Sequence, residues 1–304
     1  MIDIRNNSIY FFIIGITLAF GLLGWLRPEW LLQFQYPLLG VLMVLIGLPH
    51  GATDFLLFRR LQGKVLSKKQ IFRFFLFYLL AAFCYLLVWL IWPIPALLFF
   101  LVISAFHFGQ SNWQSSRVPS GLSFWLYMLW GAFVLGGALL WHWDKSSLII
   151  GQLIGCRLEW STSAMANIQW GLLCINILAI VVLWVSGRID RRQGLFEMAS
   201  LVVLSFMLYQ TPLLVGFTVY FTLWHSLGSL FQQLTFFRRS WPSFTLLEYY
   251  RQAAPYTLLS LLGLWGMALG QPLFFSGFSL ISLFFILLAC VTLPHIFLIE
   301  GSFK

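Results

Sequence analysis

Long apolar runs, separated by short polar or charged connections, follow one another along the whole chain. A helix needs about 20 mostly apolar residues to cross the hydrocarbon core of a bilayer. The pattern predicts ten such helices, over residues 8–26, 30–48, 71–92, 97–110, 122–141, 168–186, 195–209, 213–234, 257–269 and 278–299. Three of them are short, so the expected number of spans is about eight to ten.

Proline and charge mark the ends of the runs. The first run stops at Arg27-Pro28-Glu29 and the third at Pro93-Ile94-Pro95, because proline cannot continue a helix beyond its first turn. The long connection over 144–167 includes residues 147–154, which we expect to form a helix at the membrane interface. The pattern therefore predicts an all-α, polytopic transmembrane helical bundle, with residues 1–304 forming a single integral membrane domain.

Composition supports a membrane setting. The chain is 61% hydrophobic and 9% charged, with a mean hydropathy of +0.89, whereas soluble domains are about 25% charged. No small-residue cleavage site follows the first run, so we expect it to be retained as a helix. The four cysteines are scattered and form no C-x-x-C pair, which argues against a disulfide framework or a thiolate metal site.

The net charge of +9 is explained by topology. With ten spans and a cytoplasmic N-terminus, 15 cations lie inside: Arg5, Arg59, Arg60, Lys64, Lys68, Lys69, Arg73, Arg117, Arg188, Arg191, Arg192, Arg238, Arg239, Arg251 and Lys304. Only Arg27, Lys145 and Arg157 lie outside. This asymmetry is what the positive-inside rule requires. It predicts a protein of the bacterial inner membrane with both termini in the cytoplasm, and it removes the reason to invoke nucleic acid.

Four of the five histidines lie inside or at the edge of apolar runs, namely His50, His107, His225 and His295. Ionisable groups within a membrane are costly, so each one is a functional candidate. In the ten-span topology all four lie on helices that run from outside to inside, in the middle or inner part of the membrane. His142, between Trp141 and Trp143 at the opposite face, fits an interfacial aromatic belt, and we exclude it.

Imidazole is a common metal ligand, and four of them in one membrane domain predict a site for a single ion. Metal-binding histidines usually donate their second N–H to a carboxylate or carbonyl group. Asp54, one turn beyond His50, is the first candidate for that role and Glu300 the second. Gln110 and Ser226 are polar neighbours of two of the histidines and complete the predicted cofactor-binding set.

The motifs around these residues resemble the Brp/Blh family of bacterial and archaeal membrane proteins, the β-carotene 15,15′-dioxygenases that make retinal for rhodopsins. The resemblance rests on Pro49-His50-Gly51 with Asp54, on His107-Phe108-Gly109, on Trp224-His225-Ser226 and on Pro294-His295, in this order. It implies a non-haem Fe²⁺ held by histidines alone, which uses O2 to cleave a carotenoid at its central double bond. A docked rhodopsin partner is left open.

One position departs from the family pattern. Ser229 stands four residues after His225, where the family usually has a second histidine. Either His295 completes the metal shell, or three histidines and water do, or the chain is a divergent member. Other classes also stay open: a carotenoid hydroxylase or desaturase, a non-catalytic carotenoid or haem carrier, and a transporter.

Overall fold

The structure of the protein is a computed structural model that describes residues 8–63, 65–113, 118, 120–239 and 241–302. No strand occurs among these residues, and helices account for nearly all of them, so the all-α prediction is confirmed. Within the described ranges, eight helical stretches are long and apolar enough to cross a membrane: Ile9–Leu26, Pro28–Leu61, Lys68–Ile91, Pro93–Trp113, Gly121–Leu139, Thr162–Val185, Leu213–Arg238 and Leu280–Leu298. The chain is an integral membrane protein.

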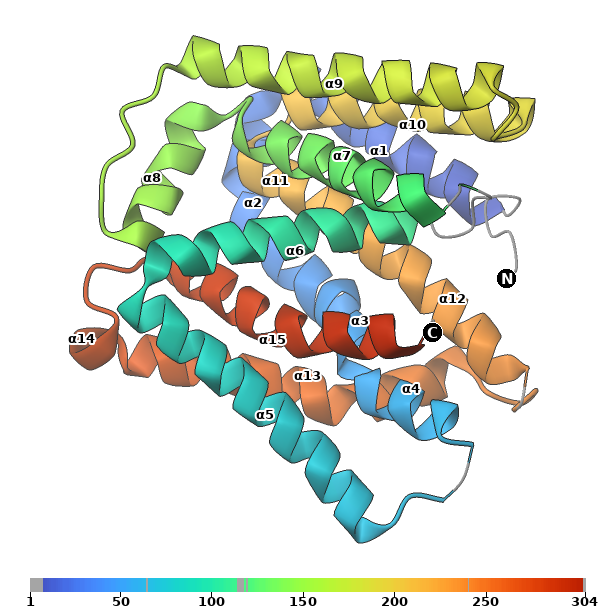
Figure 1. Cartoon of the computed structure of the whole chain (residues 1–304). Coiled ribbons are helices and arrows are strands. Elements are labelled where there is room, and N and C mark those ends of the chain that lie inside the picture. Colours follow the sequence, from blue (N-terminus) through green and yellow to red (C-terminus); the bar gives the residue numbers. More distant parts are fainter. Residues whose placement is uncertain (1–7, 64, 114–117, 119, 240, 303–304) are drawn as a thin grey trace. The chain divides into compact units, whose positions relative to one another are not determined.

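The α-helices carry the same labels in Figure 1, and the full order of helices is as follows. They are α1 (Ser8–Leu26), α2 (Pro28–Leu42), η2 (Met43–Gly47), α3 (Leu48–Ala52), α4 (Asp54–Leu61), α5 (Lys68–Ile91), α6 (Pro93–Trp113), α7 (Ser120–Leu139), α8 (Trp143–Ile154), α9 (Thr162–Val185), α10 (Arg191–Gln210), α11 (Leu213–Val219), η3 (Tyr220–Leu227), α12 (Gly228–Arg238), α13 (Leu246–Leu269), α14 (Gln271–Phe274) and α15 (Leu280–Ser302). η2 and η3 are π-helices.

Proline and capping residues set the helix ends more closely than the lengths of the apolar runs do. Pro28 occupies the first turn of α2, where its missing N–H costs nothing, and α6 likewise starts at Pro93 rather than at the predicted residue 97. α13 starts eleven residues before the predicted 257, because Thr245 and Glu248 form a capping box. A helix is present over 147–154 as part of α8.

α10 and α13 cover two of the three short predicted spans, and neither belongs to the eight apolar stretches. α10 carries the fully buried Glu197 and packs along α1 and α9, both of which are candidate spans. A helix shielded by such neighbours can hold polar residues without exposing them to lipid. The eight stretches lie at the lower end of the expected eight to ten, and the ten-span topology stays a prediction.

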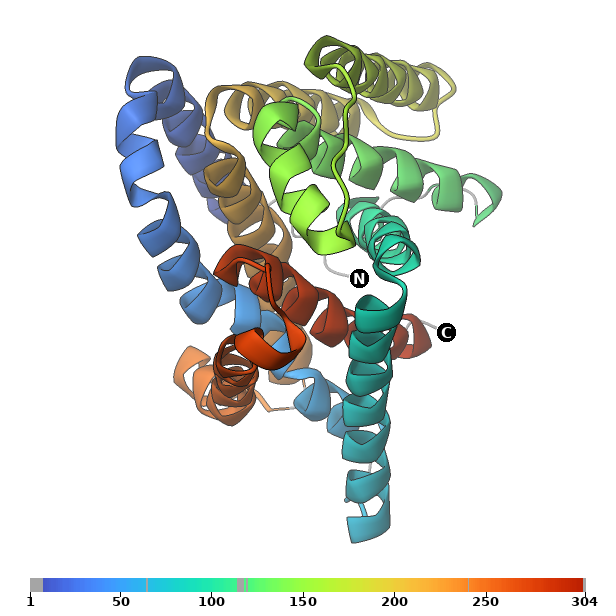
Figure 2. The same ribbon diagram turned by 90° about the vertical axis from the view of Figure 1, so that its left-hand side faces the viewer.

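The chain forms two compact units, each assembled from three segments. Unit 1 contains residues 1–43, 104–147 and 158–226, and unit 2 contains residues 44–103, 148–157 and 227–304. The expectation of one domain over 1–304 stays a prediction. In unit 1, α10 packs against α1 and α9, α7 against α9, and α2 against α1 and α11; Figure 2 shows α1 and α2 side by side.

Unit 2 is built around α15. This helix packs against α5 and α13, and α13 also packs against α3. One buried cluster joins α5, α6, α13 and α15 through residues that include Trp89, Leu283 and Ile286. A second joins α4, α12 and α13 through Leu57, Phe237 and Tyr249, among others.

Candidate metal centre

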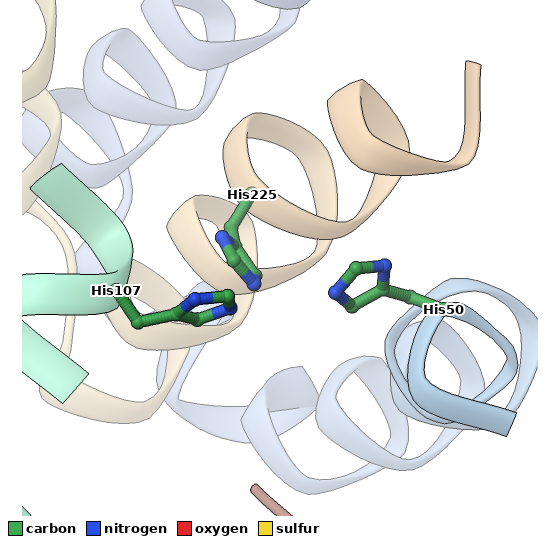
Figure 3. Close-up of side chains that lie close together, drawn as sticks. All are labelled: His50, His107 and His225. Atoms are coloured by element: carbon green, nitrogen blue, oxygen red, sulfur yellow. The ribbon is translucent and has the colours of Figure 1, made fainter. Parts of the chain in front are cut away.

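Unit 1 holds a pair of histidines from two helices. His107 on α6 and His225 on η3 are 5% and 3% exposed, and their ring centroids are 4.8 Å apart at 73°. They offer ring nitrogens within 4.8 Å of each other, and Figure 3 shows the two imidazoles close together. The sequence separates these residues by more than a hundred positions, and the fold of this unit brings them into contact.

His225 lies in a π-helix, where the backbone is wider than in an α-helix. Such segments are rare and occur often at functional sites. Its neighbour Trp224 is fixed by a hydrogen bond from Nε1 to the Thr17 hydroxyl oxygen (2.8 Å), and that hydroxyl in turn donates to the Ile13 carbonyl oxygen (2.7 Å). α1 therefore anchors the turn that carries His225.

Aromatic rings surround the histidine pair of unit 1. The ring of His225 lies 4.9 Å from that of Phe108 and 5.6 Å from that of Phe221, and Phe217 stacks on Phe221 at 5.6 Å. Flat, polarisable faces of this kind match an extended conjugated ligand. Rings packed this closely also exclude water from the imidazoles.

Unit 2 holds the second pair. His50 on α3, also drawn in Figure 3, and His295 on α15 are each 5% exposed, with ring centroids 4.8 Å apart at 76°. Pro49 lacks a backbone N–H, so we expect it to free the carbonyl one turn earlier. The π-helix η2 does precede it, and the Leu45 carbonyl accepts a hydrogen bond from the Tyr250 hydroxyl (2.9 Å).

A buried polar network holds the turn that carries His50. The Thr53 hydroxyl donates to Gln233 Oε1 (2.6 Å), and the Tyr249 hydroxyl lies 3.1 Å from the same oxygen and 3.3 Å from the Pro49 carbonyl oxygen. These residues come from α12, α13 and the break between α3 and α4. No sequence motif predicts this network, although Gln233 is an amide within an apolar run.

Asp54 is paired with His295. Nδ1 of His295 lies 2.8 and 2.9 Å from the two carboxylate oxygens of Asp54, which is 2% exposed. With its proton on Nδ1, the ring presents the lone pair of Nε2, as a metal ligand requires. The second donor to Asp54 is the Tyr78 hydroxyl (2.9 Å to Oδ2), a residue that the sequence analysis did not single out.

The other polar residues that the sequence predicts near the site make fewer contacts that bear on metal binding. Ser226 is fully buried beside His225, and Gln110 is half-buried on α6; their role in the site stays a prediction. The side chain of Glu300 lies outside the residues whose side chains the structure describes.

His142, which the sequence analysis excludes from the site, is partly buried, and its Nε2 is 2.7 Å from the Leu208 carbonyl oxygen. Burial lowers the pKa of His142, so the ring is neutral near pH 7 and holds α10 to the end of α7.

The donor set of both pairs fits a late first-row metal ion. Each pair offers buried imidazoles from different helices, and the thiol of the one buried cysteine, Cys290, packs in an apolar cluster instead. Imidazole without thiolate suits Fe²⁺, Zn²⁺, Cu²⁺ and Ni²⁺. These residues therefore suit a redox-active ion such as Fe²⁺, and they lack the thiolate ligands of a structural zinc site.

Comparisons with known proteins point to a family of dioxygenases. The family model described as beta-carotene 15,15′-dioxygenase matches residues 41–301. A curated beta-carotene 15,15′-dioxygenase from uncultured marine bacterium 66A03 is 29% identical over 190 residues, which cover 61% of this chain and 64% of the relative. The chain therefore spans somewhat under two thirds of that relative's length. No solved structure matches the chain.

Proposed function

Because the chain belongs to the beta-carotene 15,15′-dioxygenase family, we propose that it cleaves a carotenoid with O2 to give retinal. The most specific form of this proposal is β-carotene cut at its central 15,15′ double bond. One molecule of O2 provides an oxygen atom to each of the two new aldehydes, so the reaction balances without an external reductant. The curated relative carries the same activity in its name.

The observation that carries the proposal is the pair of buried histidines within each unit. Oxygen-activating non-haem Fe²⁺ sites commonly use three or more protein ligands and keep positions open. One histidine pair is too few for this, whereas two pairs are enough. We therefore propose that His50, His107, His225 and His295 bind a single Fe²⁺, with His295 taking the place of the family's histidine at position 229.

Fe²⁺ bound to these residues would supply the redox chemistry that lets O2 react with an alkene. The chain's own residues have three tasks. The histidines hold the ion, Asp54 fixes the ring of His295, and Phe108 and Phe221 keep water from His225. Aromatic faces also orient the polyene, and positioning of this kind can supply much of the rate. No charged group is needed, because the substrate is apolar.

The test is to express the full chain in a β-carotene-producing bacterium, extract retinoids, and count metal ions in the purified protein. We expect retinal and one iron per chain. Two irons per chain would favour a hydroxylase or desaturase, and a Soret band without retinal would favour a haem carrier. Absence of retinal from iron-loaded protein supplied with β-carotene and O2 would contradict the proposal.

A second experiment asks whether His295 replaces the missing ligand at position 229. We expect His295→Ala to lower Fe²⁺ affinity by about 10- to 100-fold or more, and Ser229→His to recover at least part of the loss in that background. Ser229→Ala in the same background is the matched control and should recover nothing. Equal affinities of the His295→Ala variant and the wild type would remove His295 from the proposed ligands.

A further inference from the structure

The hydroxyl of Tyr78 is the one hydrogen-bond donor to Asp54 from outside the histidines that the structure records in the described part of unit 2. It lies 2.9 Å from Oδ2 of Asp54, and Nδ1 of His295 lies 2.8 and 2.9 Å from Oδ1 and Oδ2 of the same carboxylate. Tyr78 lies on α5, Asp54 at the start of α4 and His295 on α15. A hydrogen-bonded chain of three side chains therefore joins three helices and ends at an imidazole.

The position of Asp54 explains why it needs a second donor. It follows Thr53, whose φ of −93° and ψ of 6° break the helix between α3 and α4. A carboxylate can rotate about its terminal bond, because that torsion is broad. One imidazole N–H does not fix the plane of the carboxylate, whereas a second donor on one of the two oxygens does. The ring of Tyr78 lies 5.8 Å from that of Phe74, one turn earlier on α5, and Phe74 in turn stacks on Phe58 of α4 at 4.9 Å.

We propose that Tyr78 is a positioning residue for the metal, acting through Asp54 to orient His295; this inference rests on the proposed function. The Tyr78 hydroxyl fixes the carboxylate, the carboxylate fixes the imidazole, and Nε2 keeps the direction that a ligand needs. Partners of this kind, one step removed from a metal, typically change its affinity by about 10- to 100-fold when they are replaced. The hydroxyl also lies 3.4 Å from the Val291 carbonyl oxygen, one turn before His295.

A purely structural role is the competing explanation, because the same hydroxyl ties α5 to α4 and α15. Tyr85 offers the matched control for it. It lies seven residues further along α5, it is 4% exposed, and its hydroxyl donates to the Ala96 carbonyl oxygen (2.8 Å) in an apolar cluster without histidines. Tyr85→Phe and Tyr78→Phe each delete one largely buried hydroxyl and keep the ring, so they should cost similar stability.

The experiment uses the purified full chain in detergent and Co²⁺ as the probe. Affinity is measured by competition with a chelator, the visible d–d spectrum reports the ligand geometry, and thermal unfolding without metal reports stability. We expect Tyr78→Phe to weaken Co²⁺ binding by about tenfold and to shift the spectrum. We expect Tyr85→Phe to change neither the Co²⁺ affinity nor the spectrum. Both variants should unfold at similarly lowered temperatures.

A double-mutant cycle tests the route through Asp54. In the Asp54→Ala background, or Asp54→Asn if alanine prevents folding, adding Tyr78→Phe should cause no further loss of affinity. Equal Co²⁺ affinities and spectra of Tyr78→Phe and the wild type would overturn the inference alone, as would an equal loss in Tyr85→Phe. If the wild-type chain binds no Co²⁺ and no Fe²⁺, the proposed function fails together with it.

Discussion

Replacement of His107 by alanine is expected to abolish retinal formation. The change removes one of two imidazoles whose rings lie 4.8 Å apart in unit 1. Loss of residues that only support metal ligands already costs about 10- to 100-fold, so loss of a ligand should cost about 100-fold or more. The measurements are retinal formed in β-carotene-producing cells and iron retained per purified chain.

The three other histidines should behave alike if they share one ion. His50→Ala, His225→Ala and His295→Ala are each expected to lower retinal formation and iron content together. Strong non-additivity in double variants would follow, because the first loss already empties the site. Full activity of His107→Ala with normal iron content would rule out the proposed ligand set.

His142→Ala is the control for removing an imidazole as such. Its ring nitrogen lies 2.7 Å from the Leu208 carbonyl oxygen, so the variant should lose about 1 kcal/mol of stability. It should keep its iron and its activity. A loss of activity in His142→Ala as large as in His107→Ala would mean that the assay reports folding rather than the metal site.

Replacement of Gly109 by alanine is the second change with a large expected effect. α6 and α7 approach each other so closely that a methyl group on Gly109 would overlap the Tyr127 backbone, and one on Gly131 would overlap the Ala105 backbone. The two contacts lie four residues apart on each helix, the spacing of small residues in tightly packed membrane helices. Backbone atoms cannot rotate away, so the helices must separate.

We expect Gly109→Ala to cost about 3 kcal/mol, at the upper end of overpacking effects, and to displace the part of α6 that carries His107. Retinal formation should therefore fall although the histidines are intact. Thermal unfolding in detergent and the retinal assay together measure both effects. Gly131→Ala, from the other helix, should reproduce them.

Gly171→Ala in α9 is the matched control, because an added methyl group meets no atom within 4 Å. Alanine is the better helix former by about 1 kcal/mol, so this variant should be as stable as the wild type or slightly more so. If Gly109→Ala and Gly171→Ala unfold at the same temperature, the close approach of α6 and α7 is wrong. Loss of activity in Gly109→Ala would then need another cause.

Much of the fold was predictable because it depends on local sequence. Apolar runs of membrane length predict helices wherever they occur, and eight of the ten predicted runs match their helical stretches with shifts of up to six residues at the ends. The second stretch continues to Leu61 instead of ending at residue 48. α13 starts eleven residues before the predicted position, because the charged side chains of Glu248 and Arg251 lower the hydrophobicity of a first segment that the capping box makes helical. The effect of Pro49 on the preceding turn is also local, and the structure confirms it.

The sequence by itself determined the helical class, the membrane setting and the identity of the buried histidines, because each depends on residue type and on spacing along one helix. Tertiary structure alone decided that His107 pairs with His225, that His50 pairs with His295, and that Asp54 contacts a histidine 241 positions away. It also placed Tyr78 beside Asp54 and Gln233 beside Thr53. A hydrogen bond requires atoms within about 3 Å, and for residues on different helices only the packing of those helices sets that distance.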